Sequence, residues 1–553
     1  MKKAILLLSA LTISGVMNAQ TEERDAVVNV ENGYTPVVIE VGKMNFTPST
    51  NRNIDIQPAK AKFSKKGIVY KEFTSEREID DVLPKKEEEQ PGYARLGYGL
   101  TNDIDAKVAY RLGVGKNGAL RAHATFDGFK CNVGGLSDKW NSRFFNNAIG
   151  VGYRHRFNSL TLDIDGKFGN SVYNYRDMGM DSLITDKQNS RNYAIAIGGT
   201  SNLQGAISYN FNGDFEYFAR SYTAGTKNGI GEGRFGIGGG IAYDIYNDLI
   251  RKVGIDLHLD AFIYDRTLER EHQGFCTHVS IDANPSLGFT FGNWTVGVGT
   301  KMNFITRGGG VFAIAPNISA ESNLNKNVTV YAGITGGRES NSLAKLESMS
   351  PYWGFTNGGM ERLKPTYKIA DINIGSRMSF KTLSFDINAG YAYTQKDLLE
   401  VGVPQISNDS RYSLIYSNFV QDNTHHLYVG ARLGFNFRSW IKLSGEAKYD
   451  FWACSNKDLL MMKPEVRASV NAEARIIEHL TLQLGYDYAL YTKGKTTGRI
   501  SDKHDLHARL SYQITKRFGA YIEGNNLIND KYYEFAGYET RGIRGSLGAT
   551  VNF

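Results

Sequence analysis

RGIRGSLGATVNF, residues 541–553, ends the chain and indicates how most of it is built. Every second residue of this stretch is apolar or glycine: Ile543, Gly545, Leu547, Ala549, Val551 and Phe553. The residues between them are polar or glycine: Arg544, Ser546, Gly548, Thr550 and Asn552. A period of two predicts a β-strand with one apolar and one hydrated face. The chain therefore closes with an amphipathic strand that ends on an aromatic residue.

The same alternation fills the chain from residue 92 onward. THHLYVGARLGFNF (424–437) and PEVRASVNAEAR (464–475) each place apolar residues on one face and polar residues or glycine on the other. A soluble β-sandwich alternates in the same way, so the pattern alone does not identify the solvent that the apolar face meets.

Three further features predict a transmembrane β-barrel. The alternating runs are often about 10 residues or longer, as tilted membrane-spanning strands require. Tight turns alternate with longer polar segments, which is the rule for outer-membrane barrels. The tight turns fall at 158–159, 201–202, 247–248, 292–293, 381–382, 478–479 and 516–517, and the longer segments at 128–144, 175–189, 338–364, 397–424 and 526–540. An export signal at the start of the chain makes the outer membrane reachable.

The expected fold is an all-β, antiparallel barrel of about 22 strands, with apolar residues toward lipid and polar residues toward the lumen. The last strand must pair with the first, near residues 93–110, because lipid leaves no backbone group unpaired. Four residues of the last strand are expected to close the barrel and to form its C-terminal signal: Leu547, Ala549, Val551 and Phe553. Residues 410–420 are placed in a loop hairpin, and bulges are expected at Pro285 and Pro316.

The chain divides into three parts. Residues 1–19 have two lysines, an apolar run and a small residue at the end, which is typical of a cleaved secretory signal peptide. Residues 20–91 are charged and aperiodic, and are read either as an extended periplasmic arm or as a disordered leader. Residues 92–553 form the barrel.

Composition excludes several classes of function. The net charge of +7 is small and its signs are dispersed, so no nucleic-acid-binding surface is indicated. The three cysteines, Cys131, Cys276 and Cys454, fit neither a disulfide framework nor a zinc site. The mean hydropathy of -0.36 does not fit a multi-helix membrane protein.

No motif indicates catalysis or a bound cofactor. GVGKNG (113–118) follows a strand without leading into a helix, so it is interpreted as a hairpin turn. Asp256, His258 and Asp260 share one face about 7 Å apart from residue to residue. A hydrated lumen wall is the favoured reading of these three residues, with a weak metal site as the alternative. The prediction is a protein that is not an enzyme.

Two stretches resemble TonB-dependent receptors at moderate specificity. YIEGNNLINDKYYEFAGYETRGIRGSLGATVNF (521–553) is similar to the receptor C-terminus, and ERLKPTYKIADINIG (361–375) to a stretch that precedes a receptor strand. The matching residues are Asn525, Asn526, Leu527, Tyr532, Arg541 and Phe553, followed by Leu363, Lys364 and Pro365. Thr366 stands where those receptors have Glu, and their Pro-Gly before the arginine is missing. The resemblance implies 22 strands and recognition of the C-terminus by the barrel-assembly machinery.

One departure from that family separates two functional hypotheses. The receptors carry a plug domain before the barrel, whereas residues 20–91 show no plug-like pattern and no TonB box, as in plugless barrels of the Bacteroidetes type. The first hypothesis is solute passage or uptake across the outer membrane, with the lumen occluded by the arm and loops. The alternative is a non-transporting scaffold or accessory subunit of an assembly or secretion complex. Expected partners are outer-membrane lipid and a periplasmic or surface lipoprotein, and not nucleic acid.

Overall fold

The structure is a computed structural model, and it describes most of the chain from residue 91 onward. The described residues are 91–134, 139–177, 187–202, 206–221, 229–245, 249–265, 268, 275–307, 310–355, 363–406, 413–437, 440–496 and 498–553. The signal peptide predicted for 1–19 lies outside them, as does the predicted arm apart from Pro91.

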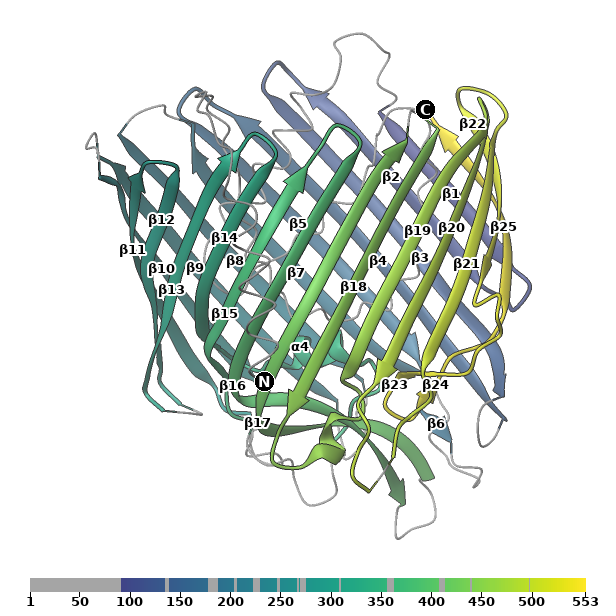
Figure 1. The fold of residues 1–553 in the computed structure, drawn as a ribbon. Coiled ribbons are helices and arrows are strands. Elements are labelled where there is room, and N and C mark those ends of the chain that lie inside the picture. The colour runs from purple at the N-terminus through teal and green to yellow at the C-terminus, as the bar shows by residue number, and fades with distance from the viewer. Residues whose placement is uncertain are drawn as a thin grey trace, which may run out of the picture.

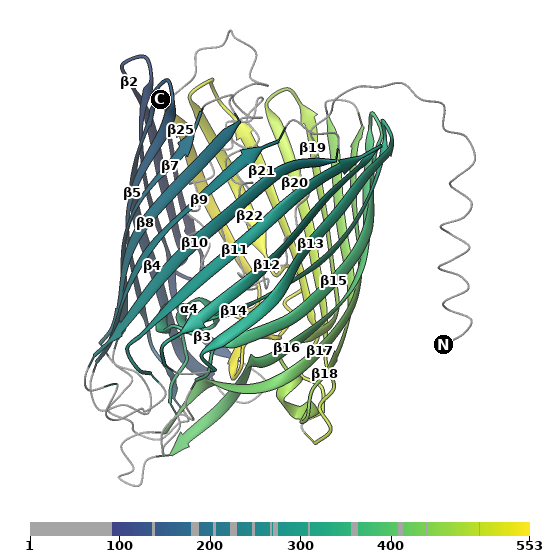
Figure 2. The same ribbon diagram turned by 90° about the vertical axis from the view of Figure 1, so that its left-hand side faces the viewer.

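The described chain is almost entirely β-strand (Figures 1 and 2). In chain order the elements are β1 Gly92–Gly99, β2 Ile104–Val114, β3 Gly118–Gly134, β4 Lys139–Arg156, β5 Leu160–Tyr173, β6 Arg176–Asp177, β7 Gln188–Ser201, β8 Ile207–Arg220, β9 Ile230–Asp244, β10 Ile250–Tyr264, β11 His278–Phe291, β12 Trp294–Ile305, β13 Phe312–Asn325, β14 Val328–Glu339, α4 Leu343–Met349, β15 Thr366–Ser379, β16 Leu383–Ile406, β17 Ser413–Phe437, β18 Ile441–Ala453, the 3-10 turn η1 Lys457–Leu460, β19 Pro464–Ile477, β20 Leu480–Tyr491, β21 Lys503–Gln513, β22 Phe518–Asn525, β23 Tyr533–Phe535, β24 Tyr538–Glu539 and β25 Arg544–Asn552. Within the described part of the chain, no helix is long and apolar enough to cross a membrane.

One sheet closes on itself to form the barrel. The sheet has 23 strands, and removing the two-residue β6 leaves the predicted 22. Neighbouring barrel strands are antiparallel, and β25 pairs with both β22 and β1. Closure between the last strand and the first is therefore confirmed, and it satisfies backbone groups that an open edge would leave unpaired.

Strand register sorts the side chains onto two faces. On β17, Leu427 and Val429 are 52% and 50% exposed on the outside, whereas Tyr428 between them is 6% exposed on the inside. The adjacent His425 and His426 also point apart, since His425 stacks on Tyr393 and His426 on Trp452. The apolar faces read from the sequence are thus the outer surface of the barrel.

The two ends of the barrel differ in their connections. At the end that carries the C-terminus, called the turn end here, short turns join the strands, such as residues 115–117 between β2 and β3. Gly115 has φ +66 in this turn, which confirms the hairpin reading of GVGKNG. The longer connections and α4 lie at the opposite end, called the loop end (Figures 1 and 2).

Strand pairing continues past the barrel wall in two hairpins. The loop hairpin expected at 410–420 is confirmed from Ser413, where the first part of β17 pairs with the end of β16. Residues 128–144 were read as a loop, yet β3 and β4 pair as far as Gly134↔Lys139. The two strands of each hairpin continue beyond the barrel wall because their backbone groups form hydrogen bonds with each other.

The bulges expected at Pro285 and Pro316 are absent, because each proline falls where one ladder is interrupted. Pro285 pairs in register with Ile255, and the ladder between β11 and β12 has a gap beside it without a shift. Pro316 pairs with Thr300, and the ladder between β13 and β14 starts only at the next residue, Asn317. Because proline has no backbone N–H, it cannot donate a ladder hydrogen bond, but at both sites one of the two ladders is already interrupted. The proline therefore costs few interstrand hydrogen bonds.

Side chains bridge the wall where β13 and β14 are not paired. Arg338 on β14 donates to the side chain of Asn303 at 2.6 Å and to the carbonyl oxygens of Asn303 at 3.1 Å and Val311 at 3.3 Å. It also donates to the carbonyl oxygen of Gly310. One guanidinium thus supplies donors to carbonyl groups in a part of the wall that the β13–β14 ladder does not reach.

Candidate functional site

A segment between β14 and β15 enters the barrel at the loop end. We call residues 340–355 the inner loop. It contains α4, which begins after Ser342, whose side chain accepts a hydrogen bond from the Lys345 amide at 3.1 Å. From the barrel wall, Glu232 of β9 accepts a hydrogen bond of 2.6 Å from the amide of Leu343, the first helical residue. The negative charge of a carboxylate at the N-terminal end of the helix is also stabilised by the helix dipole.

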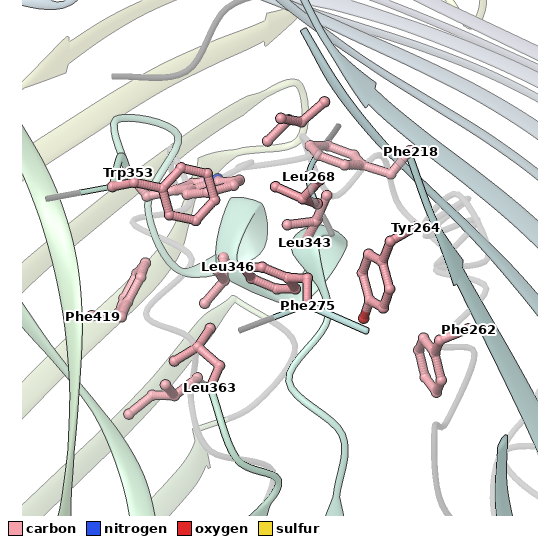
Figure 3. Packing of buried hydrophobic residues seen from close by; sticks show 13 residues of the cluster. Phe218, Phe262, Tyr264, Leu268, Phe275, Leu343, Leu346, Trp353, Leu363 and Phe419 are labelled. Carbon is pink, nitrogen blue, oxygen red and sulfur yellow. The ribbon is translucent and has the colours of Figure 1, made fainter. Parts of the chain in front are cut away.

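The apolar side of α4 packs against residues of the barrel wall and the loop end. Leu343 and Leu346, three residues apart, lie on one face of the helix and are fully buried. Figure 3 shows both of them among aromatic side chains. Their cluster contains Phe218, Ile230, Phe262, Tyr264, Leu268, Phe275, Trp353, Phe355, Leu363, Leu398 and Phe419. Burial of this cluster anchors the inner loop.

Arg220 at the end of β8 holds the second half of the inner loop. Its side chain is 0% exposed, with one guanidinium nitrogen 2.8 Å from the Glu347 carboxylate and another donating to the Trp353 carbonyl at 2.8 Å. It also donates to the carbonyl oxygen of Pro351. The guanidinium carbon lies 4.4 Å from the centre of a Trp353 ring. One buried cation thus fixes the exit of α4 to the barrel wall.

A second cluster joins the inner loop to the hairpin β23–β24. The rings of Tyr352 and Tyr538 stack with centroids 3.7 Å apart, and Tyr173 and Trp140 meet them edge-on. The Tyr538 hydroxyl donates to the Ile415 carbonyl at 2.6 Å. Burial raises the pKa of Tyr352 and Tyr538 above the usual tyrosine range. Both phenols therefore remain protonated and able to donate at physiological pH.

Ser417 on the extended part of β17 connects the inner loop, β16 and β23–β24. Its amide donates to the Tyr352 carbonyl at 2.9 Å, and its carbonyl accepts from the Gly354 amide at 2.9 Å. The Ser417 hydroxyl donates to Glu400 at 2.7 Å, and Glu400 also accepts from the Ala536 amide at 3.0 Å. The carboxylate of Glu400 therefore links segments that lie far apart in the sequence.

The lumen wall between the two ends is lined by mixed charges in ion pairs. Arg234 contacts Asp214 at 3.0 Å and Asp260 at 2.7 Å, and on the other side of the barrel Arg467 contacts Asp450 at 2.8 Å. His258 lies 3.3 Å from Asp260, which Arg234 already engages. The described residues contain no group of three or more His, Cys, Asp or Glu side chains placed to hold a metal. Asp256, His258 and Asp260 all lie on β10, and His258 and Asp260 belong to this network of ion pairs.

The receptor-like residues of the C-terminal stretch stabilise turns at the loop end. Asn526, with φ 49, is fully buried, and its side chain bonds both backbone groups of Asp530 at 2.8 and 2.9 Å. The Tyr532 hydroxyl donates to Asp505 at 3.0 Å. Arg541 pairs with Asp103 beside the first hairpin. These contacts bind the last loop to β21 and to the connection between β1 and β2.

The remaining predicted residues have different surroundings. Asn525 donates to Glu523 at 3.0 Å, and Leu527 is exposed. Leu363 belongs to the cluster around α4, the Lys364 carbonyl accepts from Asn341 at 2.7 Å, and Pro365 directly precedes β15. The structure therefore brings Leu363 to the inner loop but leaves Asn525 and Leu527 outside it.

The predicted closure residues lie on the outer side of the barrel seam. Leu547 and Ala549 are exposed, Val551 is half-buried, and Phe553 stacks on Tyr110 at 6.1 Å between ring centres. Phe553 and Gly92 exchange two backbone hydrogen bonds of 2.8 and 3.0 Å. A Cβ atom on Gly92 would clash with the Phe553 ring in this position, so a larger residue there would displace the ring.

Sequence reasoning missed the inner loop and its anchors Glu232 and Arg220. The alternation pattern predicts this segment only as part of the polar connection 338–364. SLAKLESM (342–349) does carry a local signal, since a serine cap precedes leucines three residues apart. PYWGF (351–355) is also unusually aromatic for a polar loop.

Comparison with known proteins supports the fold. No protein-family model matches the chain, and no curated protein matches it either. A ferric enterobactin receptor mutant from Pseudomonas aeruginosa is similar in structure, with a TM-score of 0.62 and 10% identity over 84% of this chain and 80% of that one. The copper transporter OprC gives 0.60 and 11% over 84% and 80%. The closed form of the ferric-catecholate import receptor Fiu from E. coli K12 gives 0.60 and 11% over 85% and 82%.

At this level of identity the likeness defines a shared fold. The chain has the fold of large receptor barrels, and that fold supports an outer-membrane location.

Proposed function

We propose that the protein mediates solute passage or uptake across the outer membrane, and that its loop end faces outward and is closed by the inner loop. The observation that carries this proposal is the inner loop itself, which Glu232, Arg220 and Ser417 hold from three strands. A barrel of this size would otherwise leave a wide aqueous hole. The neighbours in fold are described as receptors and a transporter, which agrees with the proposal.

The lumen wall is consistent with passage of hydrated solutes of either charge. Its cations and anions alternate and pair, as in Arg432 with Glu446 at 3.3 Å. Over the described part of the wall, cations and anions are mixed, so these residues create no single-sign field that would select cations or anions. The arm at 20–91 is proposed to occupy the lumen from the periplasmic side. Insertion by the barrel-assembly machinery and a lipoprotein partner remain predictions.

The test uses cells that express the full chain or a variant in which a short Gly-Ser linker replaces residues 341–355. We expect the linker variant to make cells sensitive to a large hydrophilic antibiotic that the outer membrane normally excludes. Arg432→Ala is the control, because its ion pair is exposed and lies outside the inner loop. If the linker variant inserts normally and cells stay resistant, the loop does not close a passage and the scaffold function is favoured instead.

A further inference from the structure

The outer surface of β3 and β4 changes character toward the loop end. On the barrel wall, Phe126 and Phe145 face outward with ring centres 6.1 Å apart. Nearer the loop end, Lys130 on β3 pairs in register with Arg143 on β4. The next outward pair, Asn132 and Asn141, is joined by a side-chain hydrogen bond of 3.1 Å. Moving along these two strands, one passes from aromatic rings to cations and then to amides.

Two cations directly opposite each other are unfavourable in an antiparallel pair. Directly opposed residues have Cβ atoms about 5 Å apart, and like charges at that separation destabilise the sheet. Among the described residues, no acidic side chain forms an ion pair with Lys130 or Arg143. The two side chains cannot avoid each other by turning toward the lumen, because strand alternation places both of them on the outer face.

Charge is rare on this side of the outer surface. Along β1–β5 and β7–β9, the outward positions whose side chains are described carry three charged residues: Lys130, Arg143 and Arg191. All three are cations in the loop half of their strands. Arg191 belongs to β7, which is separated from β4 by β5. The rest of this surface is apolar or neutral, as the hydrocarbon region of a bilayer requires.

We infer that Lys130 and Arg143 form a docking site for the phosphorylated headgroup of a lipid in the outer leaflet. A phosphate between the two cations would turn their repulsion into two charge-assisted contacts. The amides of Asn132 and Asn141 lie beyond the cations and can bond polar groups of the headgroup. Phe126 and Phe145 lie on the membrane side, where acyl chains would cover them. The order of side chains thus matches the order of chemical groups in a phosphorylated lipid.

The experiment measures binding of bisphosphorylated lipid A to the delipidated, detergent-purified full chain by native mass spectrometry. For Lys130→Gln/Arg143→Gln we expect about 30-fold weaker binding, because each basic residue near an anionic membrane surface contributes about 1 kcal/mol. Arg251→Gln is the matched control, since Arg251 is an exposed arginine at the turn end. This variant should bind lipid A with the affinity of the wild type. Slower migration after heating in gel electrophoresis reports whether each variant is folded.

Two further arms identify the ligand and guard against misfolding. Dephosphorylated lipid A should bind the wild type as weakly as the phosphorylated lipid binds the double variant, and Lys130→Arg/Arg143→Lys should bind like the wild type. Equal binding by the wild type and Lys130→Gln/Arg143→Gln would overturn the inference. So would displacement of the lipid by an equal concentration of inorganic phosphate, which would assign the site to a free anion.

Discussion

Replacing Arg220 by alanine should release the inner loop without unfolding the barrel. The substitution removes an ion pair of 2.8 Å with Glu347 and a hydrogen bond of 2.8 Å to the Trp353 carbonyl, both in a buried setting. Removing one partner of a buried ion pair typically costs about 3–5 kcal/mol. Loss of this energy should shift the equilibrium between the seated and the released inner loop toward the released state by roughly a hundredfold to a few thousandfold.

Hydrogen-exchange mass spectrometry measures this shift directly. Peptides covering residues 343–355, and the peptide that contains Ser417, should exchange faster in Arg220→Ala by the same factor, since the Gly354 and Ser417 amides are protected only while the loop is seated. Arg432→Ala is the control, because exposed ion pairs contribute only about 0–1 kcal/mol. Equal exchange of these peptides in the two variants would refute the assignment of Arg220 as the anchor.

Three further predictions concern the barrel and its last loop. Phe553→Ser should lower the yield of inserted barrel in outer-membrane fractions, because it removes the ring that stacks on Tyr110 at the seam; normal yield would contradict this. Arg338→Ala should lower the free energy of unfolding by about 2–4 kcal/mol in denaturant titrations, since it strips donors from carbonyls beside the β13–β14 gap. Asn526→Ala should speed proteolysis of residues 526–532, because alanine tolerates φ 49 poorly and loses both bonds to Asp530; unchanged cleavage would count against the role of this turn.

The barrel was predictable because its signals are local. The tight turns predicted at 158–159, 292–293 and 478–479 lie between β4 and β5, between β11 and β12, and between β19 and β20. Alternation and turn residues are repeated in each hairpin, so errors do not accumulate. The connection between β16 and β17 is shorter than the predicted segment 397–424, because the end of β16 and the first part of β17, from Ser413, pair beyond the wall, where no lipid-facing pattern is required.

The closure at the loop end was not predictable because its contacts are distant in sequence. Arg220 and Trp353 are separated by 133 residues, and Tyr538 contacts a carbonyl 123 residues away. The sequence pattern places both Arg220 and Arg432 on the inward face of a strand but does not indicate how deeply each is buried. Only the fold shows that Arg220 is buried and Arg432 exposed. The same limit applies to Lys130 and Arg143, whose opposition depends on register.

Single-channel conductance in a planar bilayer tests the central claim most directly. The intact protein should be closed, and removal of both residues 20–90 and the inner loop should open a wide, weakly selective pore. Removal of either segment alone should give smaller or intermittent openings if both contribute to closure. If the doubly truncated protein inserts, shows the heat-dependent migration of a folded barrel and still does not conduct, the account of a gated passage is contradicted.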